Sequence, residues 1–213
     1  MRTLLTTLVA TFLFVGGTTI AADFSFGLEG DQDGLRGFYV TIGEHFQAPE
    51  KEIVELRKRR IDDEAMPVVF FIARHTGVTC AAVLTQRERS GSWMDVAIHF
   101  GLEADVFYVP VSKDVGPPYG KAYGHYKNRK RDDWKEIRLT DSEIINFVNL
   151  SMISDHYGYP PEDIIEKRGG KHSFIDIHAD IKERTNVTTK PIAADDTRSD
   201  RGAGKSKGRD KKK

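Results

Sequence analysis

Hydrophobic residues recur along this chain with the spacing of amphipathic helices, and one local pattern of them occurs three times. Each copy begins with a histidine, passes through a short turn to two adjacent apolar residues, and ends with an arginine twelve positions after the histidine. A truncated fourth copy begins at His99. Such repetition is typical of a chain that stacks one structural unit several times. The complete copies run from His45 to Arg57, from His75 to Arg87, and from His156 to Arg168.

The residues that flank each copy predict helices on both sides of the turn. Residues 142–155 place apolar side chains at helical spacing, and Thr140 and Glu143 precede them with the spacing of a capping box. Gly77 and Gly158 stand where a helix ends in a left-handed residue. We expect helices near residues 36–46, 50–60, 63–75, 79–88, 92–100, 103–109, 141–156, 161–168 and 173–184, although 38–42 and 107–111 have a strand-like composition.

These elements predict an all-α fold for residues 23–185, built as an array of three to four short helix-turn-helix units. The last helix of one unit serves as the first helix of the next. Trp93 and Phe174 follow the capping residues of their units, so both are expected in the core. Residues 112–138 have a different character, rich in Gly, Tyr and Lys or Arg, and we expect a long irregular insertion loop there.

The start of the chain predicts export. Residues 1–22 combine a positively charged beginning, an apolar run and a small-residue end, which is the layout of a secretory signal peptide. The apolar run is shorter than the roughly 20 residues that cross a bilayer. We therefore expect cleavage after Ala21 or Ala22, no membrane span in the mature chain, and a periplasmic or secreted protein; an uncleaved anchor is the alternative. The lone Cys80 cannot form an internal disulfide and is expected to be buried and inert.

The formal net charge of zero hides a strong asymmetry. Residues 23–50 carry six acids against one base, whereas residues 201–213 carry seven bases against one acid. Residues 186–213 lack apolar periodicity, so we expect a disordered basic tail. This tail either keeps the protein soluble or binds a polyanion such as an acidic lipid or polysaccharide.

Aromatic and cationic side chains alternate within residues 119–134, a pattern that suits stacking on rings and pairing with anionic groups. The alternative is that the tyrosines pack back onto the helices. The candidate polyanion contacts are Tyr123, Tyr126, Lys127, Arg129, Lys130 and Arg131 in this segment and Lys211, Lys212 and Lys213 in the tail.

The recurring histidines and arginines are expected to be structural. Equivalent positions in a stacked array lie one unit apart, whereas a zinc ion needs its ligands within about 2 Å, and a histidine at the end of a helix favours the helix dipole. We therefore expect neither a metal nor a cofactor. The residues interpreted as structural are His45, His75, His99, His156, Arg57, Arg87, Arg168, Trp93 and Phe174.

The sequence favours an exported, non-catalytic scaffold or partner-binding module of the cell envelope, with an unidentified envelope partner. Polyanion binding is the main alternative. Residues 73–83 also have helix-turn-helix spacing, but the helix that would enter DNA is poor in the side chains that read bases, so we do not expect nucleic acid binding. No catalytic motif is present, which leaves enzymatic activity unsupported rather than excluded.

Overall fold

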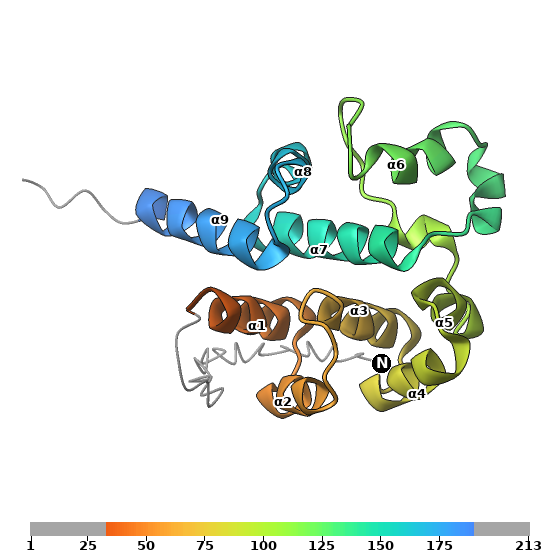
Figure 1. Cartoon of the computed structure of the whole chain (residues 1–213), viewed down its shortest axis with the longest axis horizontal. Helices are drawn as coiled ribbons and strands as arrows, with labels where there is room; N and C mark the ends of the chain where they lie inside the picture. Colours follow the sequence, from red (N-terminus) through yellow and green to blue (C-terminus); the bar gives the residue numbers. More distant parts are fainter. Residues whose placement is uncertain (1–32, 190–213) are drawn as a thin grey trace, which may run out of the picture.

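The computed structural model describes residues 33–189, and every regular element in that range is helical (Figure 1). The predicted all-α class is therefore confirmed for this part of the chain. The elements are α1 (Asp33–Phe46), α2 (Glu50–Lys58), α3 (Met66–Thr76), α4 (Cys80–Ser90), α5 (Trp93–His99), the 3₁₀ helix η1 (Ala104–Phe107), α6 (Gly120–Lys127), the 3₁₀ helix η2 (Arg131–Glu136), α7 (Asp141–Tyr157), α8 (Pro161–Gly169) and α9 (Phe174–Thr189).

The two ends of the chain bear on the predictions about export and the tail. The predicted signal peptide, residues 1–22, lies outside the described residues, as do residues 190–213 of the predicted basic tail. Residues 186–189, which we assigned to that tail, continue α9 instead.

Two rows of helices face each other across the core. One row contains α1 and α3, the other contains α9 and α7, and α1 packs on α9 while α3 packs on α7 (Figure 1). Helices α2 and α4 lie outside the first row, and α8 and α6 lie outside the second (Figure 1). Fully buried side chains such as Phe38, Ile72, Phe147 and Ile153 fill the interior. Their removal from water is the main source of stability in a fold of this size.

Two glycines on α1 allow α9 to approach closely. A Cβ atom on Gly37 would lie 3.1 Å from the ring of His178, and one on Gly34 would lie 3.7 Å from the Cβ of Ala179. The first distance is tighter than ordinary van der Waals contact. A larger residue at position 37 would therefore push α9 away from α1.

The predicted helix ends are confirmed at several positions. Gly77 and Gly158 end α3 and α7 with φ angles of 73° and 62°, the left-handed conformation that glycine adopts without strain. Thr140 and Glu143 form the capping box at the start of α7. Pro67 lies in the first turn of α3, where its missing N–H removes no helical hydrogen bond.

One arrangement of arginine, carboxylate and aromatic ring occurs twice. Arg87 and the backbone N–H of Trp93 both donate to Asp141, and the guanidinium lies 4.8 Å from the centre of the Trp93 ring. Arg168 and the backbone N–H of Phe174 both donate to Glu64, and that guanidinium lies 4.4 Å from the centre of the Phe174 ring. Each carboxylate thus satisfies an N–H that a helix start leaves without an intrahelical partner. Both aromatic rings are buried.

The segment 112–138 differs from the irregular loop that we predicted, because it contains α6 and η2. The helix forms because Tyr119, Ala122, Tyr123 and Tyr126 lie at the spacing of one helical face and pack inward. We did not predict this helix because Gly120 and Gly124 lie between these residues, and glycine disfavours helix formation.

Residues 38–42 lie inside α1 despite their strand-like composition, so the predicted helix at 36–46 is confirmed. Two smaller predictions need correction. Residues 103–109 contain only the short 3₁₀ helix η1. Cys80 is half-buried rather than buried, since it lies at the exposed start of α4 with its Sγ 3.6 Å from Glu52 Oε2. Partial burial together with this carboxylate raises the pKa of the Cys80 thiol to about 12, which disfavours the reactive thiolate.

Candidate functional site

Tyrosine and tryptophan rings gather where η1, α6 and η2 meet. The centre of the Tyr108 ring lies 4.8 Å from that of Trp134, 5.0 Å from that of Tyr126 and 5.8 Å from that of Tyr123. These four rings line a cavity of about 290 Å³, together with Val111, Ser112, Lys113, Asp114, Val115 and Lys127. We call this cavity the aromatic pocket.

Hydrogen bonds to the backbone hold two of these rings in place. The Tyr126 hydroxyl donates to the carbonyl oxygen of Ala104, and the Tyr123 hydroxyl donates to that of Val109, both at 2.7 Å. Burial raises the pKa of both tyrosines above its ordinary value, so both hydroxyls stay protonated as donors. Tyr126 is buried and forms part of the wall beneath the surface, whereas Tyr108, Tyr123 and Trp134 remain partly exposed.

The rim of the aromatic pocket carries paired charges. Lys127 Nζ lies 2.9 Å from both carboxylate oxygens of Asp114, and both side chains are largely exposed. The guanidinium of Arg131 lies 5.0 Å from the centre of the Trp134 ring, and Arg129 lies 3.4 Å from Glu136. Residues 108–136 nevertheless contain seven lysines and arginines against four aspartates and glutamates, a net charge of +3 in a chain whose total is zero.

The structure brings most of the candidate polyanion contacts in this segment together. Tyr123, Tyr126 and Lys127 line the aromatic pocket, and Arg131 covers the Trp134 ring. Lys130 and Arg129 are exposed beside η2. The tail candidates Lys211, Lys212 and Lys213 lie outside the described residues.

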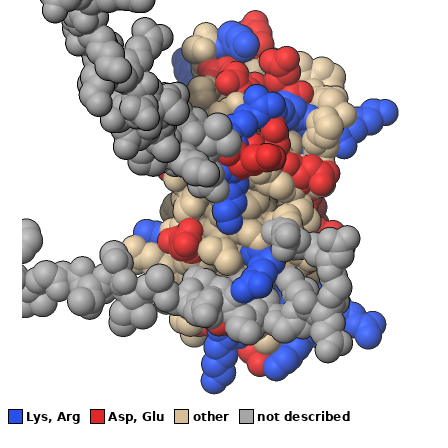
Figure 2. All heavy atoms as spheres, turned by 90° about the vertical axis from the view of Figure 1, so that its left-hand side faces the viewer, with Lys and Arg blue, Asp and Glu red and all other residues tan. Residues whose placement is uncertain are grey.

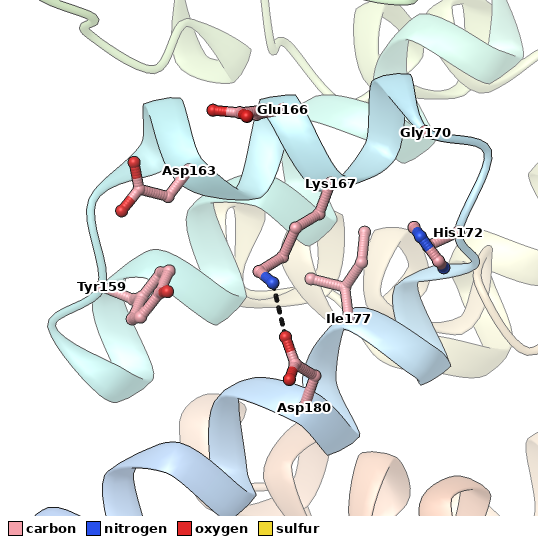
Figure 3. Close-up of a pocket in the computed structure, with 8 residues that line it drawn as sticks. All are labelled: Tyr159, Asp163, Glu166, Lys167, Gly170, His172, Ile177 and Asp180. Carbon is pink, nitrogen blue, oxygen red and sulfur yellow. Dashed lines mark hydrogen bonds and ion pairs between the residues drawn. The ribbon is translucent and has the colours of Figure 1, made fainter.

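A second cavity, of about 540 Å³, lies between α8 and α9 (Figure 3). Lys167 on α8 and Asp180 on α9 point toward each other, and the ammonium of Lys167 donates to the carboxylate of Asp180 (Figure 3). Hydrogen bonds from Lys167 and Arg184 lower the pKa of Asp180. Lys and Arg side chains stand beside Asp and Glu side chains on the face shown in Figure 2, with neither sign forming a separate patch. The residues that line this cavity include three carboxylates, on Asp163, Glu166 and Asp180, against the single lysine Lys167, so the cavity lacks the excess of cations found around the aromatic pocket.

A third cavity, of about 600 Å³, lies beside the Arg168–Glu64 ion pair. The buried carboxylate of Glu143, which also lines this cavity, accepts hydrogen bonds from the backbone and hydroxyl of Thr140 at 2.8 and 2.9 Å, and lies 3.4 Å from His125 Nε2. Both carboxylates are thus engaged in holding helix starts. Within residues 33–189, no group of three or more His, Cys, Asp and Glu side chains is placed to hold a metal ion.

The recurring histidines lie in the last turns of their helices, namely His45 in α1, His75 in α3, His99 in α5 and His156 in α7. The Nδ1 atom of His75 lies 2.8 Å from the carbonyl oxygen of Phe71. We expected equivalent histidines to lie one repeat unit apart, but the ring centres of His45 and His156 are separated by only 6.5 Å. Burial lowers the pKa of both.

Sequence reasoning missed a buried polar network around His178. We predicted no role for His178, which is fully buried. The signal was present, because Phe174, Ile177 and Ile181 define an apolar face to which position 178 also belongs. Tyr108 and Trp134 were also absent from our candidates, although they form the outer wall of the aromatic pocket.

No protein-family model matches the chain, and no curated protein or solved structure matches it significantly. Between residues 33 and 189, no single helix is long and apolar enough to cross a bilayer; α3 and α4 reach that length and composition only as a pair, which is bent by 114°. Function is therefore inferred from the geometry of the protein itself.

Proposed function

We propose that the protein is an exported, non-catalytic binding module whose aromatic pocket holds one ring of an acidic polysaccharide. The observation that supports this most directly is the combination of partly exposed aromatic rings with an excess of cations in one segment. Small-molecule sites are typically lined by aromatic side chains with a few polar groups, and they span about 300–1,000 Å³. At about 290 Å³, the pocket suits one ring of a polymer better than a large free ligand.

The spacing of the rings favours an anionic ligand over a cationic one. The ring centres of Tyr108, Tyr126 and Trp134 are only about 5 Å apart, so the rings touch each other and leave no room for an ammonium group between them. The partly exposed rings of Tyr108 and Trp134 instead offer an apolar wall for the face of a sugar ring. Lys113 and Lys127 at the rim supply donors for its carboxylate.

Two further parts of the proposal rest on the sequence. The signal-peptide layout of residues 1–22 supports export to the periplasm or beyond. We also propose that the helical frame arose by repetition of one helix-turn-helix unit, with the 112–138 segment inserted into it. The twofold occurrence of the arginine–carboxylate–aromatic arrangement supports this origin.

Binding of polygalacturonate, with neutral dextran as the reference polymer, tests the proposal by titration calorimetry. We expect polygalacturonate alone to bind, with an affinity that falls as salt is added. Changing Lys127, Lys130 and Arg131 together to Gln should weaken binding on the order of tenfold, since each exposed ion pair contributes up to about 1 kcal/mol. The matched control removes the same charge from α2 by changing Lys51, Lys58 and Arg59 to Gln, and should leave binding nearly unchanged.

Three outcomes separate the alternatives. Loss of binding in Tyr108→Ala would support the role of the ring wall, whereas loss only on deletion of residues 197–213 would place the polyanion contact in the tail. Binding to acidic lipid vesicles but not to polygalacturonate would replace the polysaccharide by a membrane surface. No binding to either would leave a scaffold that docks a protein partner.

A further inference from the structure

Helices α1, α7 and α9 share a buried polar network at their interface. The Nε2 atom of His178 on α9 lies 2.9 Å from the hydroxyl of Thr41 on α1 and 2.8 Å from the hydroxyl of Tyr157 on α7. The two hydroxyls lie 3.0 Å from each other. His178 is fully buried, and its Nδ1 has no hydrogen-bond partner among the described residues. The network therefore accommodates a neutral imidazole but offers no acceptor to a second ring N–H.

Two more histidines belong to the same interface. His156 immediately precedes Tyr157 on α7, and His45 at the end of α1 has its ring 6.5 Å from that of His156. Charged groups face these rings from each packed helix. They are Glu44 on α1, 3.5 Å from His156; Arg74 on α3, which donates to the carbonyl oxygen of His45; Asp155 on α7; and Lys182 on α9, whose Nζ lies over Gly37 beside the His178 ring.

Burial disfavours the charged form of all three histidines. It lowers the pKa of His178 to about 4, an effect to which Lys182 and His156 add. Burial also lowers the pKa of His156 and of His45, although Glu44 and Asp155 respectively act in the opposite direction. In a separated or unfolded state, the same side chains take up protons near pH 6.5. Acid therefore favours separation, and for His178 the effect develops as the pH falls from about 6.5 to about 4.

We propose that this interface is an acid-sensitive latch, which holds α9 against α1 and α7 while its histidines are neutral and releases α9 when they become protonated. The latch is independent of the aromatic pocket, because α6, which carries Tyr123 and Tyr126, lies near the opposite end of α7 from α9 (Figure 1). Release would expose the surface of α1 around Gly34 and Gly37, against which α9 packs closely.

Hydrogen exchange followed by mass spectrometry between pH 7.5 and 4.5, corrected for intrinsic exchange rates, tests the latch on the full chain. Each proton taken up on opening raises the opening constant up to about tenfold per pH unit. We expect this rise in α9 and in the facing part of α1, with little change in α4. Equal loss of protection in α4 and α9 would mean general acid unfolding and would overturn the proposal.

The variant His178→Gln isolates the group responsible. Glutamine cannot be protonated in this range, and its amide reaches about as far as Nε2, so it keeps hydrogen bonds to Thr41 and Tyr157. In this variant, the change in the opening constant of α9 per pH unit should be smaller than in the wild type by a factor of up to about ten. His99→Gln, which alters an exposed histidine on α5, is the matched control and should behave as wild type. If His178→Gln does not fold, His156→Gln should show a smaller flattening. An unchanged pH dependence in the folded variant would refute the latch.

Discussion

The two arginine–carboxylate–aromatic arrangements use the same groups but differ in how far water reaches them. Asp141, which binds Arg87, keeps 34% of its side-chain surface exposed, whereas Glu64, which binds Arg168, keeps 19%. Arg168 also donates to the carbonyl oxygen of His172 at 2.9 Å. A charged pair contributes little where solvent screens it and becomes costly to break where it is buried. The arrangement around Glu64 should therefore contribute more to the free energy of unfolding than the arrangement around Asp141.

The largest effects should come from the rings that these arginines cover. Trp93→Ala and Phe174→Ala each remove a buried ring at the start of a helix, and each should lower the free energy of unfolding by about 3–5 kcal/mol. Urea denaturation followed by circular dichroism measures the change. A near-neutral result for either variant would show that its ring does not contribute to the core.

An intermediate effect is expected at the more buried carboxylate. Glu64→Ala leaves Arg168 and the N–H of Phe174 without their acceptor, at a cost of about 2–4 kcal/mol in the free energy of unfolding. Glu64→Gln is the control, because its amide oxygen still accepts from Phe174 while the charge is lost; it should cost less. Equal loss in the two variants would show that the charge, rather than the cap, is what stabilises this site.

The smallest effect of the series is expected at the more exposed carboxylate. Asp141→Ala should cost about 1–2 kcal/mol, because water can replace part of the lost hydrogen bonding to Arg87 and Trp93. The same denaturation experiment ranks it against Glu64→Ala. If Asp141→Ala proved the more damaging, burial would not be the property that distinguishes the two arrangements.

The sequence was most informative where local chemistry alone determines structure. Helix ends at Gly77 and Gly158 and the capping box at Thr140 follow from short patterns, and they lie where we expected them. Helix α6 was missed because Gly120 and Gly124 lower helical propensity, and the inward packing of Tyr119 and Tyr126 outweighs that preference. Tertiary contacts of this kind cannot be read from a local window.

The candidate sites depend on contacts between residues distant in sequence, and the patterns could not supply them. Position 178 belongs to an apolar face, yet nothing local shows that Thr41, 137 residues away, meets the ring there. The approach of His45 to His156 similarly depends on how α1 packs against α7. Residue types and their clustering in 119–134 were visible, whereas the contribution of Tyr108 to the same pocket required the fold.

Asp141 and Glu64 each cap a helix that is distant from them in the sequence, and this limits how the chain can be divided into fragments that fold. Helix α5 takes its extra cap from a residue 48 positions later in the chain, and α9 takes its own from one 110 positions earlier. A fragment that ends before α7 therefore loses a cap on α5, and a fragment that begins after α3 loses the one on α9. Stacked repeats that contact only their neighbours can lose units stepwise. Apart from the local release of α9 proposed above, residues 33–189 should instead unfold as one cooperative unit and should not divide into two self-sufficient halves.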